Sequence, residues 1–77
     1  MSETFRVKDL YLAAFIYSEG KDLIKVEREG AVCWFIFADR IDCERLAEQY
    51  WVNKATGKIK AFSEAIRGLK DLIFAQK

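Results

Sequence analysis

The segment from Asp22 to Phe37 most constrains the fold, because two β-type runs meet there at a glycine turn. The first run, LIKVERE, alternates apolar and charged residues as a half-buried strand does. The second run, AVCWFIF, is apolar on both faces, so its strand needs cover on both sides. The segment therefore predicts a β-hairpin inside a layered domain.

Two turn geometries place the two strands differently. A two-residue loop at Glu29-Gly30 pairs Val26 with Cys33 and Ile24 with Phe35. A type I turn with Gly30 in a bulge instead pairs Val26 with Val32 and Ile24 with Trp34. We favour the first pairing, whose inward residues are Ile24, Val26, Cys33, Phe35 and Phe37. The opposite face then carries Val32, Trp34 and Ile36 beside Lys25, and we interpret these four residues as a candidate protein interface.

Helical periodicity accounts for most of the remaining chain. We expect a helix from about Lys8 to Glu19, apolar almost all round and therefore central. Residues 5–7 before it are either a short edge strand or an extended lead-in. A second helix begins at a cap, Asp39 or Asp42, and ends near Val52 or Asn53; its apolar stripe is Cys43, Leu46, Ala47 and Tyr50. A basic, turn-prone connection, NKATGKIK, leads to the last helix, whose stripe is Phe62, Ala65, Ile66, Leu69, Leu72 and Ile73. The predicted fold is α+β, a (β)αββαα domain spanning 1–77, with a hairpin or three-stranded antiparallel sheet packed against helices.

Gly68 interrupts the stripe of the last helix, where glycine costs up to about 1 kcal/mol relative to alanine. We favour a close approach of another backbone as the reason, and the alternative is that the cost is simply tolerated.

Composition argues against catalysis and metal binding. The chain has 77 residues, 52% hydrophobic and 32% charged, with two cysteines and no histidine. A structural zinc site needs about four Cys or His ligands, and a nucleophilic Cys or Ser needs a neighbouring base. Neither Gly57-Lys58 nor Gly20-Lys21 has the flanking residues of a phosphate-binding loop. We therefore expect no catalytic, cofactor-binding or metal-binding residues.

The two cysteines and the N-terminus also bear on location. Cys33 lies in the most apolar strand and Cys43 opens a helix, which suits buried, reduced thiols. The N-terminal sequence lacks the pattern of a secretory signal, and no apolar run approaches a membrane span. We expect a cytoplasmic protein.

Charge is distributed unevenly along the chain. Residues 1–50 carry seven Lys/Arg against ten Asp/Glu, whereas residues 51–77 carry six against two. The basic residues around the last loop and helix are candidate nucleic-acid contacts: Lys54, Lys58, Lys60, Arg67 and Lys70. Glu64 and Asp71 on the same helix favour the plainer interpretation of a solvated face. A base-stacking sheet is a poorer match, because GAVCWFIF lacks the basic-Gly-aromatic spacing of RNA-recognition folds.

Three motifs together resemble a known family. They are KDLYLAAFIY, the hairpin VEREGAVCWFIF ending in an aromatic F-x-F, and the closing FSEAIRGLKDLIF. The chain is similar over most of residues 5–75 to a family of small bacterial and phage proteins classed as a domain of unknown function. Val7 stands where we would expect a hydroxyl helix cap in such proteins. The resemblance implies fold rather than activity, because its motifs are mainly core positions.

We expect a small non-catalytic protein-interaction module whose partner is a second copy or another protein. Self-association through the hairpin would proceed either by sheet extension or by packing Val32, Trp34 and Ile36 against a copy of themselves. The alternative is a nucleic-acid-binding accessory protein that uses the basic C-terminal loop and helix.

Overall fold

The computed structural model describes residues 3–52, 57 and 59–75. Its elements, in chain order, are β1 (Phe5–Val7), α1 (Leu10–Ser18), β2 (Leu23–Glu29), β3 (Val32–Phe37), α2 (Arg40–Trp51) and α3 (Ile59–Ala75). The strands form one antiparallel sheet in the order β1-β3-β2. The α+β class and the predicted order of elements are confirmed.

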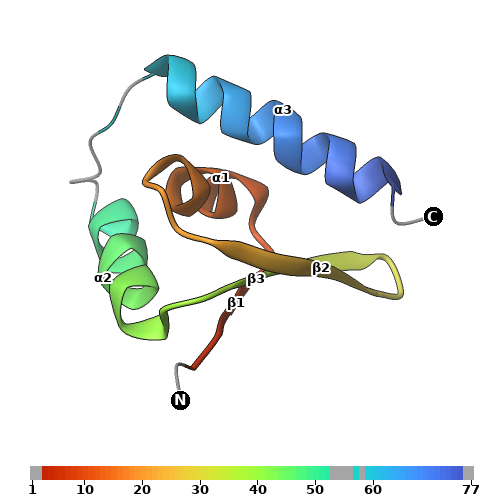
Figure 1. The fold of residues 1–77 in the computed structure, drawn as a ribbon, viewed down its shortest axis with the longest axis horizontal. Coiled ribbons are helices and arrows are strands. Elements are labelled where there is room, and N and C mark those ends of the chain that lie inside the picture. Colours follow the sequence, from red (N-terminus) through yellow and green to blue (C-terminus); the bar gives the residue numbers. More distant parts are fainter. Residues whose placement is uncertain (1–2, 53–56, 58, 76–77) are drawn as a thin grey trace.

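The first helix is the centre of the molecule. Figure 1 shows α1 between the strands and α3, with α2 beside it. All residues from Leu12 to Ile16 are buried, so this helix is covered on both sides. The apolar character that α1 shows all round its axis reflects this position, because it must pack against the sheet, α2 and α3 at once.

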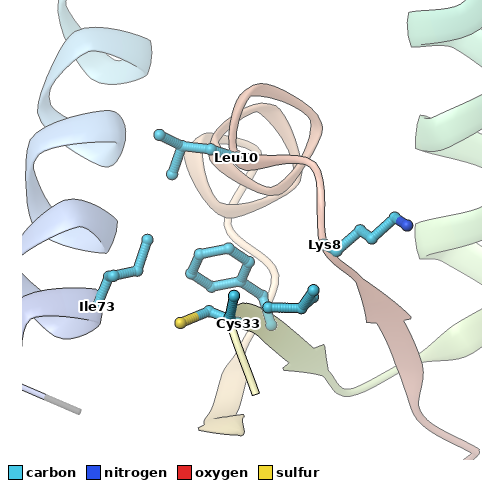
Figure 2. A pocket seen from close by; sticks show the side chains of 7 residues that line it. Lys8, Leu10, Cys33 and Ile73 are labelled. Atoms are coloured by element: carbon cyan, nitrogen blue, oxygen red, sulfur yellow. The ribbon is translucent and has the colours of Figure 1, made fainter. Parts of the chain in front are cut away.

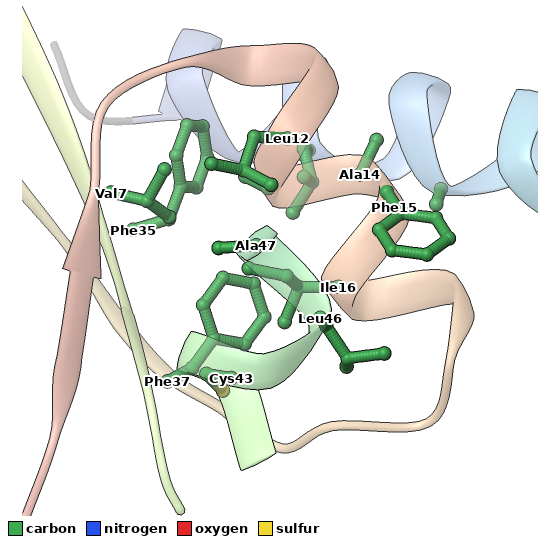
Figure 3. Packing of buried hydrophobic residues seen from close by; sticks show 13 residues of the cluster. Val7, Leu12, Ala14, Phe15, Ile16, Phe35, Phe37, Cys43, Leu46 and Ala47 are labelled. Atoms are coloured by element: carbon green, nitrogen blue, oxygen red, sulfur yellow. The ribbon is translucent and has the colours of Figure 1, made fainter. Parts of the chain in front are cut away.

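The core joins β3 to α1 and α2. Figure 3 shows Phe35 and Phe37 pointing from β3 toward Leu12 and Ile16 of α1, with α2 closing the far side. From α2 the buried residues are Cys43, Leu46 and Ala47, which confirms the predicted stripe. Only Ala65 and Leu69 are buried in α3, so the last helix is attached along a narrow line.

The hairpin register differs from both predicted pairings. Val26 pairs with Phe35, and Glu29 pairs with Val32, so the two loop residues are Gly30 and Ala31. Gly30 has φ of +63°, the left-handed conformation that type II′ hairpin turns require at their first loop residue. The favoured pairing was therefore wrong: Val26 pairs two residues further along β3, with Phe35 instead of Cys33. A shift of two residues keeps each side chain on its face, so Val26, Cys33, Phe35 and Phe37 still point toward the helices.

Ile24 is the exception to the predicted faces. An irregularity in the ladder lies between Leu23 and Lys25, and Ile24 stands in it without a β3 partner. Its side chain is 52% exposed, so the prediction that it points inward was wrong. A bulge inserts one residue into a strand, and the inserted side chain loses its place in the alternation.

The start of α1 lies two residues beyond the predicted one. Asp9 is the N-cap, and its Oδ1 accepts hydrogen bonds from the backbone N–H groups of Tyr11, at 2.9 Å, and Leu12, at 3.1 Å. Val7 is not at the cap; it is buried at the end of β1. The cap is therefore an aspartate, and the position where we expected a hydroxyl belongs to the sheet.

The start of α2 is unusual. Asp39 occupies the N-cap position with φ of +65°, and its side chain makes no capping hydrogen bond. Asp42 sits in the first turn and pairs with Lys21 across the structure. The helix ends at Trp51, close to the predicted boundary, and residues 53–56 and 58 of the predicted connection lie outside the described residues.

The expected close approach at Gly68 is not present. No atom lies within 4 Å of the position that a Cβ at Gly68 would occupy. The glycine is therefore a tolerated cost within α3 rather than a packing requirement.

Candidate functional site

The four residues of the predicted protein interface share one face of the sheet. Lys25 pairs with Ile36 across the ladder, and Trp34 and Val32 follow at alternate positions of β3. This face, which we call the outer sheet face, is turned away from the helices; at the hairpin tip, Val32 also lines the edge of a hollow beside α3. Trp34 is half-buried and lies outside the central core, as expected.

Charged side chains already cover much of the outer sheet face. The guanidinium of Arg6 lies 4.6 Å from the centre of a Trp34 ring, and the ammonium of Lys8 lies 5.9 Å from it. Arg6 also pairs with Glu27, at 3.9 Å, and Glu29, at 3.6 Å. Ile36 beneath them is only 4% exposed. Little of the apolar surface on this face is therefore open to a partner.

A more open apolar surface lies where the C-terminal half of α3 overhangs the hairpin. Two hollows flank α3 there. The first, of about 350 Å³, lies between the hairpin tip, the start of α1 and Ile73 of α3 (Figure 2). The second, of about 300 Å³, lies between Leu72 and the first half of β2. We call the exposed or half-buried apolar side chains beside them the hairpin–α3 rim: Ile24, Val32, Leu72 and Ile73.

The rim arises from how α3 is attached. Its buried residues face α1, whereas the next part of its apolar stripe projects past α1 over the hairpin. Leu72 is consequently 38% exposed, although its place in the stripe predicted burial. Of the predicted interface residues, Val32 and Lys25 line the two hollows, whereas Trp34 and Ile36 line neither.

The reactive groups near the rim are few. Cys33 is half-buried in the first hollow, and Figure 2 shows its sulfur pointing toward α3. The other thiol, Cys43, is fully buried, donates to the carbonyl of Ala38 at 3.3 Å, and has a pKa raised to about 11 by that burial. Among the described residues, no three Cys, Asp or Glu side chains are grouped to hold a metal ion. The first hollow is suited to apolar contact more than to chemistry.

A second cluster of charges joins the start of β2 to α2. The ammonium of Lys21 lies 2.6 Å from Asp42 and 3.6 Å from Asp39. The hydrogen bond from Lys21 lowers the pKa of Asp42, and the same bond raises the pKa of Lys21. This network fixes the chain before β2 against the first turn of α2.

The predicted nucleic-acid contacts are only partly within the described chain. Lys60, Arg67 and Lys70 are exposed on α3, whereas Lys54 and Lys58 lie outside the described residues. Within the described ranges, these three α3 residues make no ion pair or hydrogen bond through their side chains. Basic residues earlier in the chain differ, since Arg6, Lys21, Lys25, Arg40 and Arg45 all form ion pairs.

Comparison with known proteins agrees with the sequence resemblance. The family described as "Domain of unknown function (DUF5659)" matches residues 2–75, nearly the whole chain. The chain belongs to the DUF5659 family. No curated protein and no solved structure matches it. The family match confirms the suspected resemblance, and in this DUF5659 chain none of the described helices is both long and apolar enough to cross a membrane.

Sequence reasoning missed two of the rim residues in this DUF5659 protein. Ile24 was expected inside because strict alternation was assumed, and no sequence signal marks the bulge that exposes it. Leu72 was expected inside because it continues the apolar stripe. The useful signal was the length of that stripe, because α3 has 17 residues and α1, on which it packs, has nine.

Proposed function

We propose that this protein is a small, non-catalytic, cytoplasmic interaction module that self-associates through the hairpin–α3 rim. The observation that carries the proposal is the pair of hollows beside α3, with Ile24 and Leu72 exposed at one and Val32 at the other. Filling such hollows removes apolar surface from water at little polar cost. The two free thiols are consistent with a reducing compartment.

A second copy is the partner that this surface favours. In a two-fold contact the same patch of each copy meets its equivalent. An apolar patch can pack against itself, whereas a patch that carries one sign of charge repels itself. The rim is apolar, with Lys8 lining the first hollow and Lys25 lining the second. A net charge of +1 adds little repulsion between copies, and the opposite signs of the two halves of the chain favour their association.

Sheet extension is a weaker version of the same idea. The edge strand β2 carries four charged residues in seven and contains an irregularity, both of which discourage pairing with another strand. The opposite edge, β1, offers only three residues. We therefore favour side-chain packing at the rim over strand pairing.

The predicted Trp34-centred interface is the other version. A partner there must displace Arg6 and Lys8 from the Trp34 ring and gains little from Ile36, which the chain already buries. The rim needs no such rearrangement. Trp34→Ala is thus the variant that separates the two surfaces.

Sedimentation equilibrium across a concentration series tests the proposal. Leu72→Ser should weaken self-association about tenfold or more, the effect of losing one buried leucine from an interface. The matched control is Ile41→Ser on α2, because Ile41 is 80% exposed and lies outside the rim. Trp34→Ala should change the association little.

Three outcomes would contradict the proposal. A wild-type protein that stays monomeric at high micromolar concentration excludes self-association. A larger loss with Trp34→Ala than with Leu72→Ser moves the interface to the outer sheet face. Equal losses with Ile41→Ser and Leu72→Ser remove the rim as the site. Circular dichroism of each variant verifies that the helices remain.

A further inference from the structure

The side of α3 that faces away from the rim carries a second kind of surface. A hollow of about 340 Å³ lies along it, lined by Ser63, Ile66, Arg67, Lys70, Asp71 and Phe74. Positions 63, 67, 70 and 74 recur at spacings of four, three and four, so their side chains lie along one stripe of the helix. Leu72 and Ile73 line the two rim hollows and are absent from this one.

Two observations indicate a ligand for this stripe. Arg67 and Lys70 are exposed and pair with no other described residue, although Asp71 and Glu64 are on the same helix. Phe74 is 68% exposed at the end of the same hollow. An exposed aromatic ring beside two available cations offers both a stacking surface and charge for an anion.

We infer that this stripe of α3 binds single-stranded nucleic acid, with a phosphate between Arg67 and Lys70 and a base stacked on Phe74. Proteins that bind single-stranded nucleic acid without sequence preference combine positively charged residues along the backbone with aromatic side chains on which bases stack. The site is separate from the rim, so binding does not require self-association.

The acidic residue in the hollow helps to choose between partners. Asp71 repels an acidic polypeptide, because each side chain that such a partner could place in the hollow carries the same negative charge. A nucleic acid alternates phosphates with bases, and the amino groups of adenine, cytosine and guanine can donate to a carboxylate. A single strand also presents the face of each base, which a duplex does not.

The charge count predicts a modest salt dependence. Two cations that neutralise phosphates of a single strand give a slope of about −1.4 in log affinity against log salt. Affinity should therefore fall about sevenfold when the salt concentration rises fourfold. Additional basic residues outside the described ranges would make the slope steeper.

Fluorescence anisotropy with labelled mixed-sequence single-stranded DNA and RNA tests the inference. Arg67→Ala with Lys70→Ala should lower affinity about tenfold or more and flatten the salt slope. Phe74→Ala should lower affinity at least about fivefold and leave the slope unchanged, because it removes stacking alone. Leu72→Ser, which tests the rim, should leave oligonucleotide binding as in the wild type.

Lys25→Ala with Arg45→Ala is the matched control, because it removes the same charge from residues that form ion pairs outside α3. An equal loss in this control means that net charge alone binds the strand and overturns the site. Absence of binding by the wild type at low salt overturns the inference as a whole. Equal affinity for a poly-glutamate chain, insensitive to Phe74→Ala, makes the stripe a protein contact instead.

Discussion

Residues 3–52 and helix α3 use the same kinds of side chain in opposite ways. In the first region, Phe35 and Phe37 are buried, and five basic residues are held in ion pairs with carboxylates of the same chain. In α3, Phe74 is exposed, and the basic residues point to solvent without a described partner.

This difference shows which side chains can bind a partner without first losing contacts within the chain. A side chain that is buried or paired within the chain must lose those contacts before it can bind something else, and that loss lowers the net gain. The exposed side chains of α3, among them Arg67, Lys70 and Phe74, carry little of this cost, whereas Ala65 and Leu69 of the same helix are buried against the core. Residues 3–52 thus supply most of the core, and the exposed side of α3 together with the rim supplies surface for contact.

The largest expected contrast between the regions is in the contribution of two phenylalanines to stability. Phe37→Ala should lower the free energy of unfolding by about 3–5 kcal/mol, because it leaves a cavity between β3, α1 and α2. Phe74→Ala, at an exposed position of α3, should change it by less than about 0.5 kcal/mol. Urea unfolding followed by circular dichroism measures both, and similar losses would mean that Phe74 is part of the core.

A smaller effect sharpens the description of α3. Gly68→Ala should raise the free energy of unfolding by up to about 1 kcal/mol, because alanine restricts the unfolded chain and favours helix, and the site has room for its methyl group. Thermal unfolding of the variant beside the wild type reports the change. A lower melting temperature would show that another backbone packs against the helix there.

The smallest expected effect is the acid sensitivity of the Lys21–Asp42 pair. The hydrogen bond from Lys21 holds the pKa of Asp42 in the folded state below its ordinary value of 3.8. The stabilisation is therefore complete above the ordinary value and is lost as the pH falls through the folded-state pKa. Asp42→Asn should therefore be less stable at neutral pH and should lose less on acidification. Asp71→Asn on α3, where no ion pair to a described residue exists, is the control and should lose stability with acid as the wild type does.

The fold could be predicted largely because its signals are local. The all-round apolar helix α1 predicted a central position, and the stripe of α2 predicted the residues that it buries. Register could not be predicted in the same way, because it depends on which loop residue takes positive φ. Gly30 satisfies several turn types, and only the folded chain shows it in the first loop position.

The candidate site was harder to predict, because exposure depends on which neighbours a side chain meets. Trp34 and Ile36 were placed on the correct face, yet their cover by Arg6 and Lys8 depends on the position of β1 beside β3. Leu72 and Phe74 belong to one amphipathic helix, and both are exposed. Their exposure depends on the length of α1 and on the direction in which α3 crosses it, which the sequence of α3 alone does not specify.

Amide chemical shifts recorded on dilution from millimolar to micromolar concentration test the central claim most directly. If α3 and the hairpin supply the contact surface, shifts should move with concentration at Ile24, Val32, Leu72 and their neighbours, and α2 and β1 should stay constant. Shifts concentrated at Arg6 and Trp34 would contradict this account and place the contact on the outer sheet face. Spectra that do not change on dilution, from a protein that sediments as a monomer over the same range, would exclude self-association.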